Sequence, residues 1–129
     1  LKAVLPIIYV KLNYPEFIYI CSLSVFLGHV FPIWLKFKGG KGVATYVGIL
    51  IILNYFLGIV FGIVWVITYL MSKYSSLGSI LGSLSVPIFI FFYSNDNIMF
   101  YFIMFILIFY THRENVKRLI NKEETKTKI

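Results

Sequence analysis

The stretch VATYVGILIILNYFLGIVFGIVWVITYLMSKY, residues 43–74, is a nearly unbroken apolar run and decides the fold class. A helix that crosses a bilayer needs about 20 apolar residues, so this stretch is too long for a single crossing. Asn54 interrupts it near its middle, and Gly58 follows about one helical turn later. The stretch therefore predicts two short membrane helices that turn between Asn54 and Gly58.

The composition of the whole chain also indicates a membrane protein. Of 129 residues, 60% are hydrophobic and 13% are charged, whereas a soluble domain is nearer roughly half apolar and a quarter charged. The net charge of +7 would suit a nucleic-acid binder if the chain were soluble. Here the lysines lie between apolar runs or in the tail, so membrane topology explains the charge and no nucleic-acid partner is expected.

Further apolar runs complete the predicted bundle, and they cover residues 1–10, 17–29, 77–93 and 98–110. The polar residues 94–97, Ser-Asn-Asp-Asn, form a turn between the last two runs. We expect an all-α, polytopic integral membrane helical bundle with about six membrane segments in a single domain, residues 1–129. The first run is only half a span long, so its helix is expected to be truncated.

The content of cysteine and of metal-ligating residues is low. The single cysteine, Cys21, lies in an apolar run, which excludes an internal disulfide. The sequence shows neither a cluster with metal-ligand spacing nor a cofactor motif. We therefore expect no metal and no cofactor.

The positions of the lysines predict the orientation in the membrane, because cytoplasmic loops carry an excess of Lys and Arg. If the glycine-rich loop is cytoplasmic and the chain alternates sides, only Lys11 among the basic residues falls outside. The loop of residues 28–45, the turn of residues 73–79 and the tail of residues 111–129 then share the cytoplasmic face. Three polar segments on one face predict a single site.

The loop itself contains FKGGKGVAT, residues 37–45. Glycine permits the positive φ with which backbone N–H groups converge on a phosphate, and lysine adds positive charge. The pattern differs from a Walker loop, because Gly42 follows Lys41 where that motif requires Ser or Thr. Taken alone, the loop fits a flexible basic connector as well as a phosphate site.

Two other polar features also have more than one interpretation. His29 in GHVFPIW, residues 28–34, fits a general base or an interfacial hydrogen-bonding group, with Pro32 ending the helix. The run KYSSLGSILGS, residues 73–83, is typical of close helix packing, although Ser75 and Ser76 could also bind a ligand.

The tail begins with an amphipathic pattern, because Val116, Leu119 and Ile120 recur at helical spacing. The cationic side chains of Arg113, Lys117 and Arg118 suit anionic lipid headgroups of the membrane. His112 and Asn115 are three residues apart, so one helix face can present both.

Together, GHVFPIWLKFKGGKGVAT, residues 28–45, and HRENVKRLINKEE, residues 112–124, closely resemble motifs of bacterial acyl-phosphate-dependent glycerol-3-phosphate acyltransferases. The family patterns read GHxFPxxLxFKGGKGVAT and HxxNIxRLxxGxE, and the run that starts at Ser75 is similar to the family's SSLxSI. The resemblance spans the chain. The family also carries an earlier motif rich in Gly, Ser, Asn and Arg, and this chain begins after it.

Two positions depart from the family's last motif. Val116 replaces isoleucine, which is conservative. Lys122 replaces glycine, and we expect the lysine to relax a turn that glycine would favour.

The resemblance implies acyl transfer from acyl phosphate to sn-glycerol 3-phosphate in the inner membrane of a bacterium. Both substrates carry a phosphate, which suits cationic loops and glycine N–H groups. The residues implicated in binding substrate or phosphate are His29, Lys38, Gly39, Gly40, Lys41, Gly42, Thr45, Ser75, Ser76 and Arg113. His112 and Asn115 are the implied catalytic residues, which orient the hydroxyl or polarise the acyl carbonyl, and Glu124 is an implied structural acid. Whether His112 or a substrate phosphate takes the hydroxyl proton stays open.

Because the early motif is absent, this chain alone is expected to show little turnover, and a separate chain could supply the motif. The alternative is an inactive or split-gene fragment of the same family. A small transport subunit would carry ionisable residues inside its spans, and the middle of each apolar run contains no Asp, Glu, Lys, Arg or His.

Overall fold

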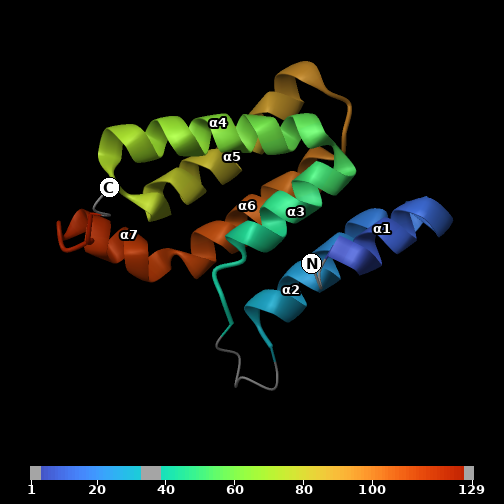
Figure 1. Ribbon diagram of the computed structural model, residues 1–129, viewed down its shortest axis with the longest axis horizontal. Coiled ribbons are helices and arrows are strands. Elements are labelled where there is room, and N and C mark those ends of the chain that lie inside the picture. The colour runs from blue at the N-terminus through green and yellow to red at the C-terminus, as the bar shows by residue number, and fades with distance from the viewer. Residues whose placement is uncertain (1–3, 33–38, 127–129) are drawn as a thin grey trace. The chain divides into compact units, whose positions relative to one another are not determined.

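The computed structural model describes residues 4–32 and 39–126, and in this part of the chain every regular element is helical. Lys38, a predicted phosphate-binding residue, lies outside the described residues. The elements are α1 (Val4–Asn13), the short 3-10 helix η1 (Pro15–Phe17), α2 (Ile18–Val30), α3 (Val43–Leu53), α4 (Tyr55–Ser72), α5 (Ser75–Tyr93), α6 (Ile98–Thr111) and α7 (Arg113–Ile120) (Figure 1). The chain divides into two compact units, residues 1–58 and 59–129.

The predicted turn at Asn54 is confirmed. Asn54 has an extended backbone (φ −155°, ψ 109°) that ends α3, and its Oδ1 accepts a hydrogen bond from the N–H of Phe56 at 3.1 Å. Gly58 lies so close to α3 that an added Cβ would be 2.9 Å from Cγ1 of Ile51. A polar side chain and a glycine thus let α3 end and α4 begin within a few residues.

Two further helix boundaries follow the sequence. α2 ends at Val30, two residues before Pro32, whose ring disfavours helical backbone in the preceding residue. α6 begins after the polar cluster, where Oδ1 of Asn97 accepts a hydrogen bond from the N–H of Phe100 at 3.3 Å. Asn97 is therefore an ordinary N-cap residue, since this bond satisfies one of the donors that a helix start leaves unpaired.

In the first unit, α1 packs against α2 and α3. The Lys11 ammonium group at the end of α1 donates a hydrogen bond to the carbonyl oxygen of Ile52 in the last turn of α3. The last carbonyls of a helix have no partner within the helix and carry partial negative charge, so a cation stabilises them. Lys11 is the one basic residue that the predicted orientation places outside the cytoplasm, and this contact gives it a structural role there.

In the second unit, α5 packs along α6, and α7 contacts both helices (Figure 1). Small residues of α5 let α4 approach closely, because a Cβ on Gly78 would be 3.1 Å from the carbonyl oxygen of Trp65. A Cβ on Gly82 would be 3.0 Å from the ring of Phe61. The indole N–H of Trp65 also donates to Oγ of Ser79 at 3.3 Å. The predicted packing role of this small-residue run is therefore confirmed.

The outward surface of these helices is apolar. Two helices, α4 and α5, are long and apolar enough to cross a membrane by length and composition, and four segments are apolar but shorter. The side chains of Ile59, Ile63 and Leu70 on α4 are each about half exposed. Contiguous apolar surface of this kind is costly in water, so these helices are suited to contact with lipid.

Lysines rather than glycines close the C-terminal ends of α4 and α7. Lys73 and Lys122 have positive φ angles of 64° and 59°. After α7, the N–H of Lys122 bonds to the carbonyl of Leu119 at 3.2 Å, and the N–H of Glu123 bonds to that of Arg118 at 2.7 Å. These two bonds form a Schellman motif, which usually has glycine at the left-handed position. The expectation that Lys122 relaxes this turn is therefore wrong, because the backbone bonds hold the lysine in the conformation that glycine prefers.

A glycine at this position should stabilise the protein. Left-handed backbone costs a residue with a Cβ roughly 1–2 kcal/mol, and part of this gain is offset by the larger entropy of glycine in the unfolded chain. We expect Lys122→Gly to raise the free energy of unfolding by about 1 kcal/mol, measured by SDS titration of the protein in mixed micelles. The matched control, Lys117→Gly within α7, should lower it by about the same amount. Equal effects of the two substitutions would contradict this account.

Candidate functional site

The candidate site residues lie in both units, and those of the first unit surround the glycine loop. Two loop glycines are required by packing against the end of α2. A Cβ on Gly39 would be 2.4 Å from the carbonyl oxygens of both His29 and Val30. A Cβ on Gly42 would be 2.5 Å from the ring of Phe26. Since real Cβ atoms do not approach other atoms so closely, both glycines hold the loop against α2.

Between these two packed glycines, Gly40 and Lys41 are exposed. Gly42 is the one glycine with positive φ (79°) among the described residues, so the positive φ that glycine permits in this loop occurs at Gly42 and not at Gly40. A Cβ on Gly40 would be 3.3 Å from Nε2 of His29, which places the exposed His29 ring beside the loop. Gly40, Lys41 and His29 are therefore accessible to a ligand in this unit.

The loop leads directly into the N-terminus of α3. Gly42 is the N-cap residue of α3 and offers no side chain to the first-turn N–H groups. Helix N-termini attract anions, because these N–H groups are unpaired within the helix and carry partial positive charge. Thr45 in this first turn is buried. With Lys41 adjacent, the local chemistry suits a phosphate.

In the second unit, His112 lies at the junction of α6 and α7. Its side chain is 2% exposed, and its Nδ1 is 2.8 Å from the carbonyl oxygen of Ile108. The backbone of His112 (φ −97°, ψ 6°) leaves the helical path and separates the two helices. This break puts a buried imidazole at the polar end of an apolar helix.

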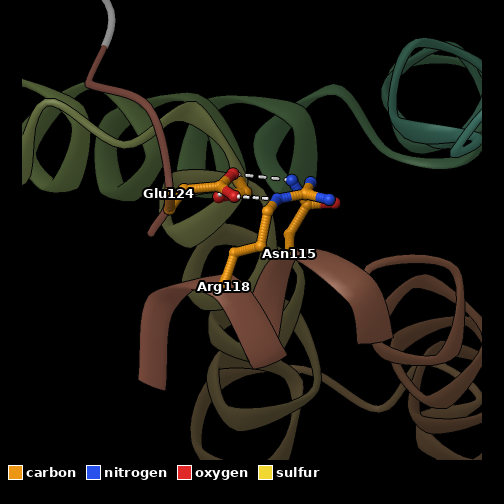
Figure 2. Close-up of polar contacts among 4 residues, drawn as sticks. Asn115, Arg118 and Glu124 are labelled. Atoms are coloured by element: carbon orange, nitrogen blue, oxygen red, sulfur yellow. Dashed lines mark hydrogen bonds and ion pairs between the residues drawn. The ribbon is translucent and has the colours of Figure 1, made fainter. Parts of the chain in front are cut away.

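Figure 2 shows the polar network that holds Asn115 on α7. Oε1 of Glu124 accepts a hydrogen bond from Nδ2 of Asn115 at 2.6 Å and one from Oγ of Ser76 on α5 at 3.0 Å. Oε2 accepts a hydrogen bond from Nε of Arg118 at 2.6 Å. The Schellman motif at Lys122 turns the chain back and so lets Glu124 reach these partners. The carboxylate thereby joins α5, α7 and the tail.

The carboxylate of Glu124 has unusual surroundings, because its side chain is only 9% exposed. Burial alone would raise the pKa of Glu124. Hydrogen bonds from Asn115, Arg118 and Ser76 and the charge of Arg118 outweigh this effect, so the pKa lies below its ordinary value of 4.5. Glu124 is therefore ionised at neutral pH.

This lowered pKa predicts how stability depends on pH. A group with a lower pKa in the folded state contributes stability above its unfolded pKa, and the contribution is lost as pH falls through the folded pKa. Glu124→Gln should lower the free energy of unfolding at pH 7 by about 2 kcal/mol, because the new amide faces the Nε–H donor of Arg118. The difference from wild type should shrink as the pH falls below 4.5.

The matched control is Glu123→Gln, which changes the exposed neighbouring acid. It should change stability by less than about 0.5 kcal/mol at either pH. If both substitutions lower stability equally, the network does not stabilise the fold.

Arg118 is the site residue that the sequence interpretation missed. From the sequence it is one of three cations suited to lipid headgroups, although the quoted family pattern also has arginine at this position. Its ion pair with Glu124 distinguishes it from Arg113, which donates to the carbonyl of Tyr110 at 3.1 Å and stacks over that ring at 4.5 Å. Ser75 at the start of α5 is exposed, whereas Ser76 is engaged by Glu124.

The second unit thus brings Ser76, Asn115 and Glu124 together, and the first unit brings His29 beside Gly40. The serine run and the tail thus meet within the second unit. The prediction that the glycine loop forms one site with them stays a prediction, because the loop belongs to the other unit.

Comparison with known proteins identifies the family that this chain resembles. The chain matches the family described as "Glycerol-3-phosphate acyltransferase" over residues 1–122. A protein of that name from Pelagibacter ubique (strain HTCC1062) is 71% identical over 128 residues, which is 99% of this chain and 67% of the relative. Another from Rhodopseudomonas palustris (strain TIE-1) is 46% identical over 108 residues, which is 83% of this chain and 53% of the relative.

Solved structures agree with this match. The crystal structure of PlsY (YgiH), an integral membrane glycerol 3-phosphate acyltransferase, in its glycerol 3-phosphate form has a TM-score of 0.87 and 30% identity. The match covers 98% of this chain and 66% of that one. The lysophosphatidic acid form matches with the same TM-score of 0.87. The all-α integral membrane fold is therefore confirmed, and the chain spans between about half and two thirds of the length of these proteins.

Proposed function

Because the chain belongs to the glycerol-3-phosphate acyltransferase family, we propose that it transfers a fatty acyl group from acyl phosphate to the 1-hydroxyl of sn-glycerol 3-phosphate. The products are lysophosphatidic acid and phosphate, which is a first step of phospholipid synthesis. The observation that carries this proposal is the 71% identity to the Pelagibacter ubique protein along 99% of the chain. The similar PlsY structures, in glycerol 3-phosphate and lysophosphatidic acid forms, support the same substrate and product.

The glycine loop has the chemistry to bind a substrate phosphate. Gly40 and Lys41 are exposed between two packed glycines, and the N-terminus of α3 follows them. In this proposal Lys41 neutralises phosphate charge and the first-turn N–H groups of α3 donate hydrogen bonds to phosphate oxygens. Lys38, which lies outside the described residues, would add a second cation.

His112 and Asn115 act on the reacting groups. A side-chain amide has two N–H donors and one oxygen acceptor, and Glu124 engages Nδ2 of Asn115. Oδ1 of Asn115 can therefore accept a hydrogen bond from a substrate hydroxyl, which is better matched to orienting glycerol 3-phosphate than to polarising the acyl carbonyl. Glu124 acts through Asn115 and is a positioning residue.

The proposed reaction needs no cofactor, because acyl phosphate is already activated. The 1-hydroxyl oxygen forms a bond to the acyl carbon, and the bond between that carbon and the phosphate oxygen breaks. The hydroxyl proton passes to His112 and then to the departing phosphate. Positioning and charge stabilisation supply most of the rate in such a transfer.

The test is reconstitution of the 129-residue chain in liposomes. Lysophosphatidic acid formation is measured with acyl phosphate or acyl-coenzyme A as donor, and glycerol 3-phosphate as acceptor. A second preparation also contains the upstream segment of the Pelagibacter ubique relative as a separate chain. We expect acyl phosphate to be the preferred donor and the upstream segment to raise turnover. Absence of product in both preparations, or equal use of acyl-coenzyme A, would contradict the proposal.

We also propose that the protein lies in the bacterial inner membrane with the glycine loop and the tail in the cytoplasm, because this orientation follows the positive-inside rule. The measurement is labelling of single cysteines in a Cys21→Ala background with a membrane-impermeant thiol reagent. A probe at Asn95, an exposed residue between α5 and α6, should react from the periplasmic side, and one at exposed Lys126 only after lysis. Reaction of both from the same side would refute this topology.

A further inference from the structure

The carbonyl oxygen of Ile108 lies at the centre of three contacts at the end of α6. Nδ1 of His112 is 2.8 Å from it, and the Thr111 hydroxyl donates a hydrogen bond to it at 2.8 Å. The backbone N–H of His112 is also within hydrogen-bonding distance, at 3.1 Å. Thr111 and the imidazole of His112 therefore share one acceptor.

This arrangement determines which imidazole nitrogen carries the proton. A carbonyl oxygen can only accept hydrogen bonds, so Nδ1 must be the donor in a contact of 2.8 Å. Oγ1 of Thr111 lies 3.3 Å from the same Nδ1. Because the hydroxyl proton of Thr111 is directed to Ile108, an oxygen lone pair of Thr111 can face the Nδ1–H group. In the neutral ring, the lone pair then lies on Nε2.

We propose that Thr111 is a positioning residue that, together with the Ile108 carbonyl, holds His112 as the Nδ1–H tautomer with its lone pair on Nε2. The catalytic consequence rests on the function proposed above, since Nε2 would be the atom that accepts the hydroxyl proton of glycerol 3-phosphate. In the opposite tautomer, the Nδ1 lone pair would face the Ile108 oxygen, which is unfavourable. In the proposed tautomer, a proton from the substrate hydroxyl can therefore bind only at Nε2.

This arrangement lies at the break between α6 and α7, where His112 ends one helix and precedes the next. The Ile108 carbonyl keeps its ordinary helical bond from the His112 N–H. A carbonyl oxygen has two lone pairs, so it can accept from side chains in addition to the backbone N–H.

Nitrogen NMR tests the tautomer independently of catalysis. The chain is labelled with 15N-histidine in lipid nanodiscs, and spectra are recorded at a pH at which the His112 ring is neutral, because protonated and unprotonated imidazole nitrogens then have well separated shifts. The protein has 2 histidines, so His112→Gln assigns the signals by removing one set. We expect a protonated Nδ1 and an unprotonated Nε2 for His112. A protonated Nε2 with an unprotonated Nδ1 would overturn the proposal.

Two variants of Thr111 test its positioning role. Thr111→Val keeps the shape but removes the hydroxyl, so the Nε2–H form should become detectable and kcat should fall by about tenfold with KM for glycerol 3-phosphate unchanged. Thr111→Ser keeps the hydroxyl and should restore both readouts. If Thr111→Val matches wild type in spectrum and kcat, Thr111 does not position His112. If wild type shows no turnover, the proposed function fails, whereas the spectra still decide the tautomer.

Discussion

Replacing His112 by asparagine should abolish most turnover while leaving the protein folded. The amide nitrogen of asparagine can donate to the Ile108 carbonyl as Nδ1 does now, but the substitution leaves no atom at the position of Nε2. Loss of a positioned proton acceptor typically costs a factor of about 10²–10⁴ in rate. We therefore expect kcat for lysophosphatidic acid formation to fall by about a thousandfold, with little change in KM for glycerol 3-phosphate.

The control for this variant is its stability. Because the donor to Ile108 is kept, the SDS midpoint of His112→Asn should lie close to that of wild type, whereas His112→Ala should lose stability together with turnover. If His112→Asn retains kcat within about tenfold of wild type, the hydroxyl proton does not go to the imidazole. A substrate phosphate would then be the acceptor.

The second large effect concerns the first unit, where Gly42→Ala should disrupt the packing of the loop on α2. A methyl group would lie 2.5 Å from the Phe26 ring and 2.9 Å from Cγ2 of Val30, in a residue whose φ is +79°. Left-handed backbone and overpacking together should lower the free energy of unfolding by about 2–4 kcal/mol. SDS titration measures this loss, and we expect turnover to fall in parallel because the loop precedes α3.

Gly40→Ala is the matched control in the same loop. Its Cβ would be 3.3 Å from Nε2 of the exposed His29 side chain, which can move aside, and φ at this glycine is not positive. Stability should stay near that of wild type, whereas KM for glycerol 3-phosphate should rise because the methyl group obstructs the approach of a phosphate. If Gly40→Ala destabilises the protein as much as Gly42→Ala, the division between packing and binding glycines is wrong.

Local sequence was sufficient to predict most helices. A polar residue inside an apolar run, as at Asn54, leaves few alternatives to a turn, and the apolar spacing in residues 116–120 predicted α7. Proline predicted the end of α2. The short helix η1 was not predicted, since three residues carry too little periodic signal.

The roles of individual site residues were harder to predict, because they depend on contacts between distant segments. Gly39, Gly40 and Gly42 look equivalent in sequence, yet an added Cβ would clash with α2 at Gly39 and Gly42 and would meet only the movable His29 side chain at Gly40. Glu124 reaches its partners because Lys122 adopts left-handed backbone. From the sequence, Lys122 was expected to relax this turn. Ser76 was a candidate ligand for phosphate, and its hydroxyl instead bonds to Glu124.

The contact between Ser76 and Glu124 has a consequence for the order in which the protein forms. These residues are 48 positions apart, and the α5–α6 hairpin lies between them. Closing so long a loop is entropically costly until the hairpin has formed, so local helices should precede this contact. During synthesis, domains form from the N-terminus onward, and Glu124 leaves the ribosome only after α5, α6 and α7. Asn115 therefore acquires its fixed orientation late in biogenesis, once the hairpin is already in the membrane.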